Sequence, residues 1–397
     1  MLFQALDDKK HCVGVYVDGN LVYDKLPENL TKTWKYSDFL ADRNIEYASL
    51  YCGSKSLTEM CPPVFLTQWK ETTERLKAFL RSFHEARVDL SKNCFFDLVP
   101  EQFLKEYCEI KNKITEHTLE ICSRPENYDF LLDMTKLVGK IKSQTLNVDT
   151  EELKSRLSEY KVRQFCKKIK TTNPVVDYNI FGTKTGRLTT RKNSFPILTM
   201  DSSYRKILKP KNGWFVELDY NAAELRALTG LLDKEQPTED IHDFNATHVY
   251  HGTTTREEAK KRIFAWLYNP HSKDSASKRV YDRDKVLKKH WHNTHVTTPF
   301  GREIDSDEYH ALNYIIQSTC SDIVLRQAIK LDKFLENYKT NIAFMIHDSI
   351  VLDMSPEDEH KINEIFHLFA DTEFGLFQSS AKAGKNFGEM KDLWIKL

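Results

Sequence analysis

The sequence has no C-x-x-C pair, no long apolar run and little glycine or proline. Its eight cysteines are scattered over 397 residues, so neither a zinc-binding pair nor a disulfide framework is predicted, and a reducing cytoplasm is the expected location. No apolar run reaches the roughly 18 residues that span a bilayer. The segment MLFQALDDKKH has neither the basic lead nor the apolar stretch of a signal peptide. We therefore expect no membrane partner.

The chain also lacks net charge, because Lys and Arg together number 58 and so do Asp and Glu. Net charge therefore gives no information on nucleic-acid binding. Basic clusters at 161–170, 204–211 and 278–290 could follow a phosphate backbone, or they could be solvated helix faces. A 40% hydrophobic and 12% aromatic composition predicts a globular protein, long enough for two or three domains.

The N-terminal part reads as a small α/β module. Residues 13–24 predict a hairpin around Asp18-Gly19-Asn20, and residues 46–51 predict another strand. Apolar residues at helical spacing predict a helix over 68–86. Within 1–100 we find no set of residues that carries chemistry.

Residues 101–170 are predicted to be helical, with breaks near Pro125 and Asn147. Strands are predicted at 214–219 and within 342–354, the second as two strands that meet at a sharp His-Asp-Ser turn. The helical stretches between them are 221–232, 240–250, 255–268 and 307–338. This order predicts a β platform that is split in sequence, with helices inserted between its halves.

Two aspartates end predicted strands of this platform. Asp219 closes the first strand, and Asp348 lies at the tip of the later hairpin. Carboxylates from separate β segments could hold two divalent ions, which is the geometry needed for in-line phosphoryl transfer. Each could instead be an ordinary cap or turn residue.

A second pattern accompanies the aspartates. Arg256, Lys260, Phe264 and Tyr268 recur every fourth residue, so they follow one stripe of a predicted helix. Two cations suit a triphosphate, and two aromatic side chains suit a base pair. The alternative is an ordinary amphipathic surface helix.

Together these segments resemble the family A, DNA polymerase I-like enzymes. The segment LDYNAAELRAL (218–228) resembles the family's D-Y-S-Q-I-E-L-R motif, and IHDSIVLDM (346–354) resembles its third motif. The stripe on 256–268 matches the family's fingers helix at all four functional positions. Smaller matches, in the expected order, are Thr185-Gly186-Arg187-Leu188, Asp240-Ile241-His242, Asn313-x3-Gln317-x-Thr319 and GKNFGEM (384–390).

The resemblance covers about 181–391 and implies an α+β right-hand polymerase fold. Its palm would contain a largely antiparallel sheet, and its fingers and thumb would be helical. The implied divisions are a small α/β N-terminal module at 1–100, a helical thumb at 101–180, palm at 181–235, fingers at 236–294 and palm again at 295–397. A compact polymerase of this kind would suit a virus, in bacterial or viral-host cytoplasm.

The resemblance implies roles for the matching residues. Asp219 and Asp348 would bind two Mg²⁺ ions, helped by the backbone carbonyl of Tyr220, with Mn²⁺ as an alternative ion. Arg256 and Lys260 would bind the triphosphate of the incoming nucleotide. Lys260 is also the candidate proton donor to the departing pyrophosphate.

Other residues would surround the nucleotide. Phe264 would pack against the sugar, and Tyr268 would stack at the template base. Glu224 would block a 2′-hydroxyl and could accept a hydrogen bond from Tyr268. His242 would approach a phosphate, although it could also be an ordinary histidine at the start of a helix.

Four further residues would contact DNA. Arg187, Asn313 and Gln317 would read minor-groove acceptors near the primer end, which every correct base pair presents alike. His347 would support the primer terminus. Asn313 and Gln317 lie one turn apart, so a solvated helix face is the alternative for this pair.

The sequence departs from the family at several positions. Ser349 replaces a glutamate after the catalytic aspartate, Asn269 replaces a glycine, and Tyr309 stands where an arginine is usual. These changes bear on fidelity, processivity and strand displacement. They leave both metal-binding carboxylates in place.

The resemblance therefore implies a DNA-directed DNA polymerase, a nucleotidyltransferase that adds dNTPs to a primer 3′-hydroxyl and releases pyrophosphate. Its partners would be primer-template DNA and dNTPs, with a separate exonuclease or replisome proteins as further candidates. Residues 1–100 are too short for the family's exonuclease fold, so no 3′–5′ exonuclease is expected. The alternatives are a single-subunit RNA polymerase, which shares His-Asp-Ser, and a catalytically inactive DNA-binding scaffold.

Overall fold

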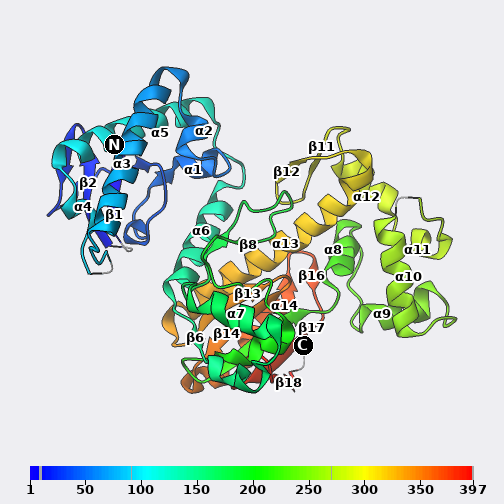
Figure 1. Ribbon diagram of the computed structural model, residues 1–397. Helices are drawn as coiled ribbons and strands as arrows, with labels where there is room; N and C mark the ends of the chain where they lie inside the picture. Colours follow the sequence, from blue (N-terminus) through cyan, green and yellow to red (C-terminus); the bar gives the residue numbers. More distant parts are fainter. Residues whose placement is uncertain (9–10, 91, 270, 396–397) are drawn as a thin grey trace. The chain divides into compact units, whose positions relative to one another are not determined.

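The computed structural model describes residues 1–8, 11–90, 92–269 and 271–395. It forms two compact units, Met1–Gly139 and Lys140–Leu397, which meet inside helix α6 (Tyr128–Ser143). Figure 1 shows the elements of both units. The domain limits expected from sequence are finer than this division and stay predictions. Within the described ranges, no helix combines the length and the apolar character that crossing a membrane requires.

The first unit contains an antiparallel sheet in the order β1-β2-β3. The hairpin predicted at 13–24 is confirmed, and Asp18 and Gly19 at its turn have φ angles of 50° and 78°. A parallel bridge between Leu2 and Lys32 joins this sheet to the parallel pair β4 and β5. The strands are β1 (Phe3–Asp8), β2 (His11–Val17), β3 (Asn20–Val22), β4 (Lys32–Thr33) and β5 (Glu46–Tyr47).

The strand predicted at 46–51 is wrong over most of its length. It pairs for two residues and then becomes helix α1, because β4 offers only two residues of partner backbone while Ala48 and Leu50 are buried on the helix. The helix predicted at 68–86 is confirmed as α3. The helices of this unit are α1 (Ala48–Tyr51), α2 (Leu57–Met60), α3 (Leu66–Glu85), α4 (Phe95–Leu98), α5 (Glu101–Ile121) and the first part of α6.

Helix α5 belongs to the core of the first unit. Its residues Phe103, Leu104 and Cys108 pack in a hydrophobic cluster with residues of β1 and β2. The fully buried Gln4 of β1 donates hydrogen bonds from Nε2 to Asn112 Oδ1 at 2.9 Å and to Thr115 Oγ1 at 3.1 Å. The polar group buried between the sheet and α5 is therefore uncharged.

The second unit is built on a five-stranded sheet in the order β13-β14-β10-β17-β18, in which every neighbouring pair is antiparallel. The strands predicted at 214–219 and 342–354 are confirmed. A tight turn joins β13 to β14, and His347 adopts a φ of 52° there. The strands are β10 (Trp214–Tyr220), β13 (Asn341–Ile346), β14 (Ser349–Met354), β17 (Ser379–Gly384) and β18 (Lys391–Leu393).

Helices α13 (Glu308–Phe334) and α14 (Ile362–Ala370) pack against this sheet. The fully buried Gln327 of α13 donates hydrogen bonds from Nε2 to backbone carbonyls at the end of α14, including Leu368 at 2.7 Å. The predicted helix at 307–338 is confirmed as α13 followed by a 3₁₀ turn at Leu335–Asn337. The unit also contains β6 (Asn147–Val148), α7 (Tyr160–Lys170), β7 (Tyr178–Asn179), β8 (Thr189–Thr190), β9 (Leu208–Lys209), β15 (Asp371–Thr372) and β16 (Gly375–Leu376).

A group of shorter helices lies between β10 and α13 in sequence and shares one hydrophobic core. Trp266, Leu267 and Ile263 of α10 pack in this core with residues of α8, α12 and α13. Buried Arg283 links the group by donating to the carbonyls of Trp266 and Asn269. The elements are α8 (Ala223–Leu231), α9 (Ile241–Phe244), α10 (Arg256–Tyr268), α11 (Ser275–Val280), α12 (Arg283–His290), β11 (His295–Thr297) and β12 (Glu303–Asp305).

Candidate active site

The two predicted metal-binding aspartates lie at neighbouring strand ends. Asp219 is directly opposite Ser349 in the antiparallel ladder between β10 and β14. Asp348 precedes Ser349 in the β13–β14 turn. The sheet therefore brings both carboxylates to one edge, formed by the end of β10 and the β13–β14 turn, which agrees with the first of the two interpretations of these strand ends.

These carboxylates lie in an acidic environment. Asp219 is accessible to solvent, although protein atoms surround much of its side chain. This partial burial, together with repulsion from the carboxylates of Glu217 and Asp348, raises the pKa of Asp219 to about 7. Burial also raises the pKa of Asp348, against the opposing effect of Arg187 and His347. Glu217 is two residues before Asp219, on the same face of β10. Sequence reasoning missed it because its role depends on the pairing of β10 with β14.

The acidic environment explains why a serine suits position 349, where the resembled motif has glutamate. The Ser349 hydroxyl donates to the Ile346 carbonyl at 3.0 Å and to Glu217 Oε1 at 3.3 Å. A glutamate at position 349 would add a further negative charge opposite Asp219. The serine thus limits the repulsion at an edge that already holds three acidic side chains.

Oxygen ligands and unneutralised negative charge suit a hard divalent cation. The raised pKa of Asp219 indicates that its charged form lacks sufficient compensation within the protein. The donor set of Asp219 and Asp348 therefore fits Mg²⁺. Among the described residues, no group of three or more His, Cys, Asp or Glu side chains surrounds a common metal position.

Tyr220 is fixed at the end of β10. Its ring stacks on Phe369 at 4.1 Å between centroids, and its hydroxyl donates to the Phe369 carbonyl at 2.7 Å. Its backbone pairs with Ser379 of β17. The backbone next to Asp219 is consequently held on both sides, which fits its expected place at the metal site.

Glu224 connects this edge to the end of α10. It lies in the first turn of α8, after Ala222, whose φ of 49° makes the sharp turn from strand to helix. One carboxylate oxygen accepts a hydrogen bond from Arg187 at 2.7 Å, and the other accepts one from the hydroxyl of Tyr268. The hydrogen bond expected between Tyr268 and Glu224 is thus present. Burial raises the pKa of Glu224, while Arg187 opposes the increase.

Helix α10 begins with a capping box in which Thr255 and Glu258 exchange hydrogen bonds. Ala259, Ile263 and Leu267 are buried and form the packing stripe of this helix. Along the neighbouring stripe, the rings of Phe264 and Tyr268 are nearly parallel, with centroids 6.0 Å apart. The helix therefore presents cations at its start and aromatic rings at its end.

The two cations of the stripe differ in their contacts. Arg256 forms a two-point ion pair with Asp240, with Nη2 at 2.7 Å and Nε at 3.2 Å, and it also contacts Glu257 at 2.8 Å. Lys260 is exposed and has no hydrogen-bond or ion-pair partner within the described part of the chain. Lys260 is thus free to meet an anionic ligand, whereas Arg256 is already held.

His242 is buried, and its ring lies 5.8 Å from Phe264. Its Nδ1 atom is enclosed and has no hydrogen-bond partner among the described residues. Burial, together with the nearby charges of Lys260 and Arg256, lowers the pKa of His242 despite the opposing effect of Asp240. A neutral histidine with a spare ring nitrogen therefore lies beside the stripe.

A buried ion pair lies against the backbone that immediately precedes Arg187. Arg302 binds Asp322 of α13 through Nη2 at 2.6 Å and Nε at 3.2 Å, and the Asp322 side chain is fully buried. A Cβ on the preceding Gly186 would lie 2.6 Å from the Arg302 guanidinium, and Gly186 has a φ of 76°. Only glycine fits here, so the Arg302–Asp322 pair fixes the backbone that presents Arg187.

The other residues expected to contact DNA lie in the same unit. Asn313 and Gln317 are partly exposed on α13, and Asn313 Oδ1 is enclosed without a hydrogen-bond partner in the described chain. His347 is exposed at the β13–β14 turn next to Asp348. Tyr309 is 57% exposed one turn before Asn313, and its ring meets the His310 ring edge to face, with centroids 5.1 Å apart.

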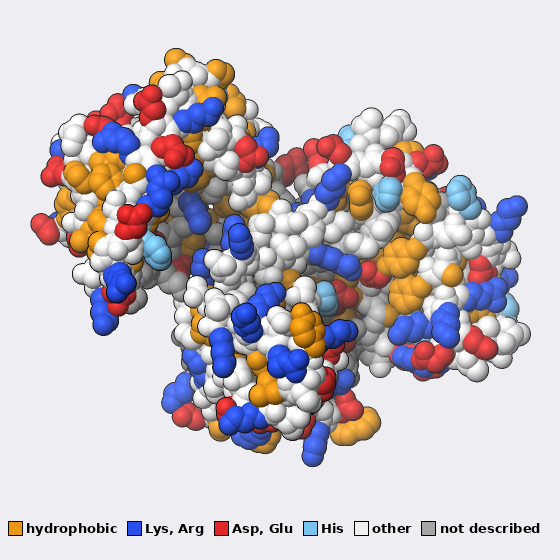
Figure 2. All heavy atoms as spheres, viewed as in Figure 1, with side chains coloured by type: hydrophobic (Ala, Val, Ile, Leu, Met, Phe, Trp, Pro, Cys, Tyr) orange, Lys and Arg blue, Asp and Glu red, His pale blue; other side chains and the backbone are white. Residues whose placement is uncertain are grey.

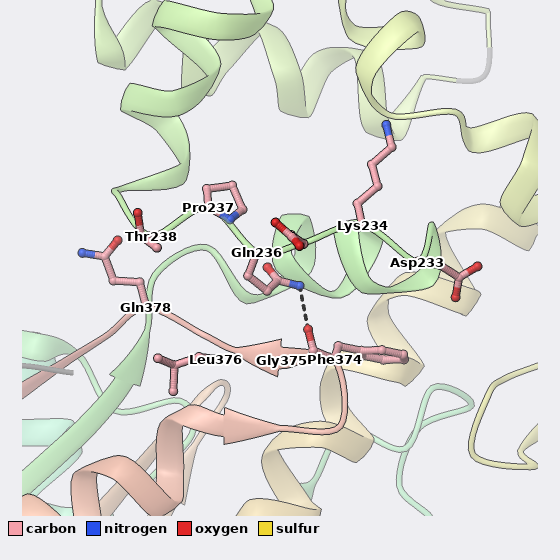
Figure 3. A pocket seen from close by; sticks show the side chains of 10 residues that line it. Asp233, Lys234, Gln236, Pro237, Thr238, Phe374, Gly375, Leu376 and Gln378 are labelled. Atoms are coloured by element: carbon pink, nitrogen blue, oxygen red, sulfur yellow. Dashed lines mark hydrogen bonds between the residues drawn. The ribbon is translucent and has the colours of Figure 1, made fainter.

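The cavities do not all coincide with these residues. A cavity of about 490 Å³ is lined by Tyr268, Tyr309 and Asn313. A larger one, of about 620 Å³, lies between the connector 233–238 and the segment 374–378 and contains none of the predicted site residues (Figure 3). We assign the site by its charged and hydrogen-bonding groups and not by cavity size, because the titratable residues that line the larger cavity, Asp233, Lys234 and Glu235, are consecutive in the chain and do not come from separate elements.

The fold resembles that of solved structures, among them one described as the POL domain of Pol1 from M. smegmatis in complex with DNA primer-template and dNTP. The likeness has a TM-score of 0.62 and covers 90% of this chain and 86% of that chain, with 12% sequence identity. No family model and no curated protein sequence matches the chain. The chain therefore has the fold of a DNA polymerase domain, established by structure and not by sequence identity.

Proposed function

We propose that this chain is a template-directed DNA polymerase of the family A type, with palm, fingers and thumb arranged as a right hand. One observation carries the proposal: charged and hydrogen-bonded groups link the carboxylates to the fingers helix. Burial raises the pKa of Asp348, and the positive charge of Arg187 opposes this increase. Arg187 also donates a hydrogen bond to Glu224, which accepts another from Tyr268. Metal-binding, sugar-contacting and base-stacking groups would thus share one site.

In this proposal Asp219 and Asp348, with the Tyr220 carbonyl, would hold two divalent ions. Those ions would activate the primer 3′-hydroxyl and stabilise the charge on the leaving pyrophosphate. Lys260 and Arg256 would bind the triphosphate, and Lys260 Nζ would donate a proton to the departing pyrophosphate. The protein would supply positioning and charge stabilisation, since no covalent intermediate is needed.

The nucleotide would lie against the aromatic half of α10. Phe264 would pack on the sugar, Tyr268 would stack at the template base, and His242 would donate or accept at a phosphate. The primer-template would be contacted by Arg187, Asn313, Gln317 and His347. These groups surround the Asp348 edge and the exposed face of α13.

The basic surface of α7 supports DNA as a partner. Four exposed lysines of this helix have no ion-pair partner among the described residues: Lys161, Lys167, Lys168 and Lys170. Figure 2 shows Lys and Arg side chains gathered over α7. A protein with zero net charge that concentrates cations in one place can bind a phosphate backbone there.

The proposal also includes the absence of 3′–5′ exonuclease activity. Gln4 of β1 and its partners Asn112 and Thr115 of α5 are neutral, and the acidic residues of 1–100 form no Asp-x-Glu motif, so the proposal assigns this unit no carboxylate metal site. Proofreading would then depend on another protein.

Primer extension tests the function. The wild-type protein with Mg²⁺ should extend a primer with dNTPs, and Asp219→Ala or Asp348→Ala should reduce the rate by orders of magnitude while DNA binding survives. Extension with ribonucleotides at an equal rate would favour an RNA polymerase instead. DNA binding without any extension would favour an inactive scaffold.

A further inference from the structure

A line of hydrogen bonds joins the end of β10 to the first residue of α10. Asn221, two residues after Asp219, donates from Nδ2 to Asp240 Oδ2 at 2.7 Å and accepts at Oδ1 from the Ile241 N–H at 3.0 Å. The same Asp240 carboxylate binds Arg256 at two points. One carboxylate thus links the strand of the metal site to the arginine of the fingers helix.

Asp240 is unusually well supplied with donors. Besides Asn221 and Arg256, it accepts from the backbone N–H groups of His242 at 2.8 Å and Asp243 at 3.1 Å, which makes it the N-cap of α9. Burial alone would raise the pKa of Asp240, but these hydrogen bonds, led by the one from Arg256, hold it well below its usual range. The carboxylate is therefore charged and fixed in position.

The connector before Asp240 is fixed by a second arginine. Arg226 is fully buried and donates to the carbonyls of Asn221 at 2.9 Å, Pro237 at 2.8 Å and Glu239 at 2.9 Å. Gln236 of the connector donates to the carbonyls of Arg226 and Phe374, each at 3.0 Å, and Figure 3 shows the second of these bonds. The guanidinium of Arg226 therefore fixes the backbone at Asn221 and just before Asp240, the two residues that this hydrogen bond joins.

The ion pair leaves Arg256 able to bind more. A guanidinium has five N–H groups. Asp240 engages Nε and Nη2, and Glu257 engages Nη1, so two N–H groups stay available for an anion. A two-point carboxylate pair also fixes the plane of the guanidinium, which reduces the conformational freedom lost when a phosphate binds.

We propose that Asn221 and Asp240 are positioning residues that hold Arg256 for the triphosphate of the incoming nucleotide and tie its position to the strand end that carries Asp219. The inference rests on the proposed polymerase function and adds to it two residues that touch neither metal nor nucleotide. Asn221 stands where the resembled motif has serine, whose shorter side chain has a single hydroxyl and cannot place a donor and an acceptor on two separate atoms as Nδ2 and Oδ1 do.

The test uses single-turnover dNTP incorporation on a primer-template, with Asp240→Asn, Asn221→Ala and Arg256→Ala measured singly and with Asp240→Asn combined with Arg256→Ala. Asparagine caps a helix about as well as aspartate, so Asp240→Asn removes the charge and keeps α9. We expect it to raise the apparent nucleotide Kd on the order of tenfold, with a smaller change in the maximal rate. Asn221→Ala should act in the same direction.

The combined variant gives the decisive comparison. If Asp240 acts through Arg256, Asp240→Asn should add little once Arg256→Ala is present. Glu257→Gln is the matched control, because Glu257 also pairs with Arg256 but is exposed and has no bond to Asn221 among the described contacts. Its nucleotide Kd should stay at the wild-type value.

The outcomes separate the two proposals. A wild-type protein that neither incorporates nor binds dNTPs overturns the polymerase function and this inference with it. If the wild-type protein is active, two results overturn the inference but not the polymerase function. One is an unchanged or lowered nucleotide Kd in Asp240→Asn, and the other is an Asp240→Asn effect that stays equally large when Arg256→Ala is also present. If melting curves show that Asp240→Asn does not fold, Asn221→Ala in the two Arg256 backgrounds provides the same comparison.

Discussion

The hydroxyl of Tyr268, in the last turn of α10, donates a hydrogen bond to the carboxylate of Glu224, in the first turn of α8. The second oxygen of Glu224 accepts from Arg187 at 2.7 Å. A side chain held at both oxygens cannot turn aside when a ligand approaches. In the proposed polymerase, this contact forms a rigid wall beside the nucleotide sugar.

Sugar selection should therefore depend on Glu224. Glu224→Ala removes the wall, and we expect ribonucleotide incorporation relative to dNTP incorporation to increase roughly tenfold or more. Ser349→Glu serves as the comparison, since position 349 faces Glu217 and not the sugar wall, and its sugar preference should stay almost unchanged. Competition between dNTP and ribonucleotide in primer extension measures both. An unchanged ratio in Glu224→Ala would remove Glu224 from this role.

Nucleotide binding should depend on Lys260. It is exposed and unpaired within the described chain, so Lys260→Ala deletes a contact to the nucleotide without breaking an internal bond. A charge-assisted contact contributes about 1.5–3 kcal/mol, so the nucleotide KM should rise, or kcat fall, by roughly ten- to a hundredfold. Primer-template affinity should change little. Lys261→Ala, one residue further along the helix, is the control, and a loss of DNA affinity in Lys260→Ala would place this face against the duplex.

Stability should vary with pH through Asp219. Its pKa is about 7 in the folded chain against an ordinary value of 3.8, so the folded state binds the proton more tightly than the unfolded state. Without divalent ions, stability should therefore be lost as pH rises from about 4 to 7. At pH 8, Asp219→Asn should be more stable by roughly 1 kcal/mol, a figure reduced to allow for solvent around this exposed side chain.

Melting curves across pH measure this effect. The difference between Asp219→Asn and wild type should shrink below pH 5, where both side chains are neutral. Mg²⁺ at pH 8 should raise the wild-type Tm and have less effect on the variant, because the ion replaces the missing compensation. A variant that is less stable than wild type at pH 8 would contradict the acidic repulsion at this edge.

Mismatched primers should not be shortened. Gln4 of β1 and its α5 partners Asn112 and Thr115 are neutral, and residues 1–100 contain no Asp-x-Glu motif, so we expect no pair of carboxylates placed for metal-dependent hydrolysis in the first unit. A labelled primer with a mismatched 3′ end should keep its length in the presence of Mg²⁺ and absence of dNTPs. Trimming that disappears in Asp7→Asn, a change on β1, would show that the unit is a nuclease.

The sequence predicted the local parts of the site because their signals are local. Strands ending in Asp219 and at the turn before Asp348, and a stripe every fourth residue on α10, follow from periodicity and turn chemistry. The bond between Tyr268 and Glu224 was predicted from the family resemblance. The roles of the site residues stay predictions until they are measured.

The contacts that the sequence did not reveal join residues far apart in the chain. Ser349 meets Glu217 through the β10–β14 register, and Arg302 meets Asp322 beneath Gly186. Asp240 was visible in a D-I-H segment, but its partners at Asn221 and Arg256 depend on how the connector folds back. No spacing rule encodes such pairings, because tertiary packing sets them. For the same reason, the two-residue length of β5 depends on its partner β4 and not on its own β propensity.

The position of β10 has a consequence for how the metal-site edge can move. This strand lies third of five and pairs along its length with β14 and β17, so its amide protons should exchange with solvent among the slowest in the unit. Asp348 instead lies on a turn next to β13, which is one of the two outer strands of the sheet. We therefore expect backbone movement that changes the distance between the two carboxylates to occur at the β13–β14 turn, while the backbone of Asp219 stays in place.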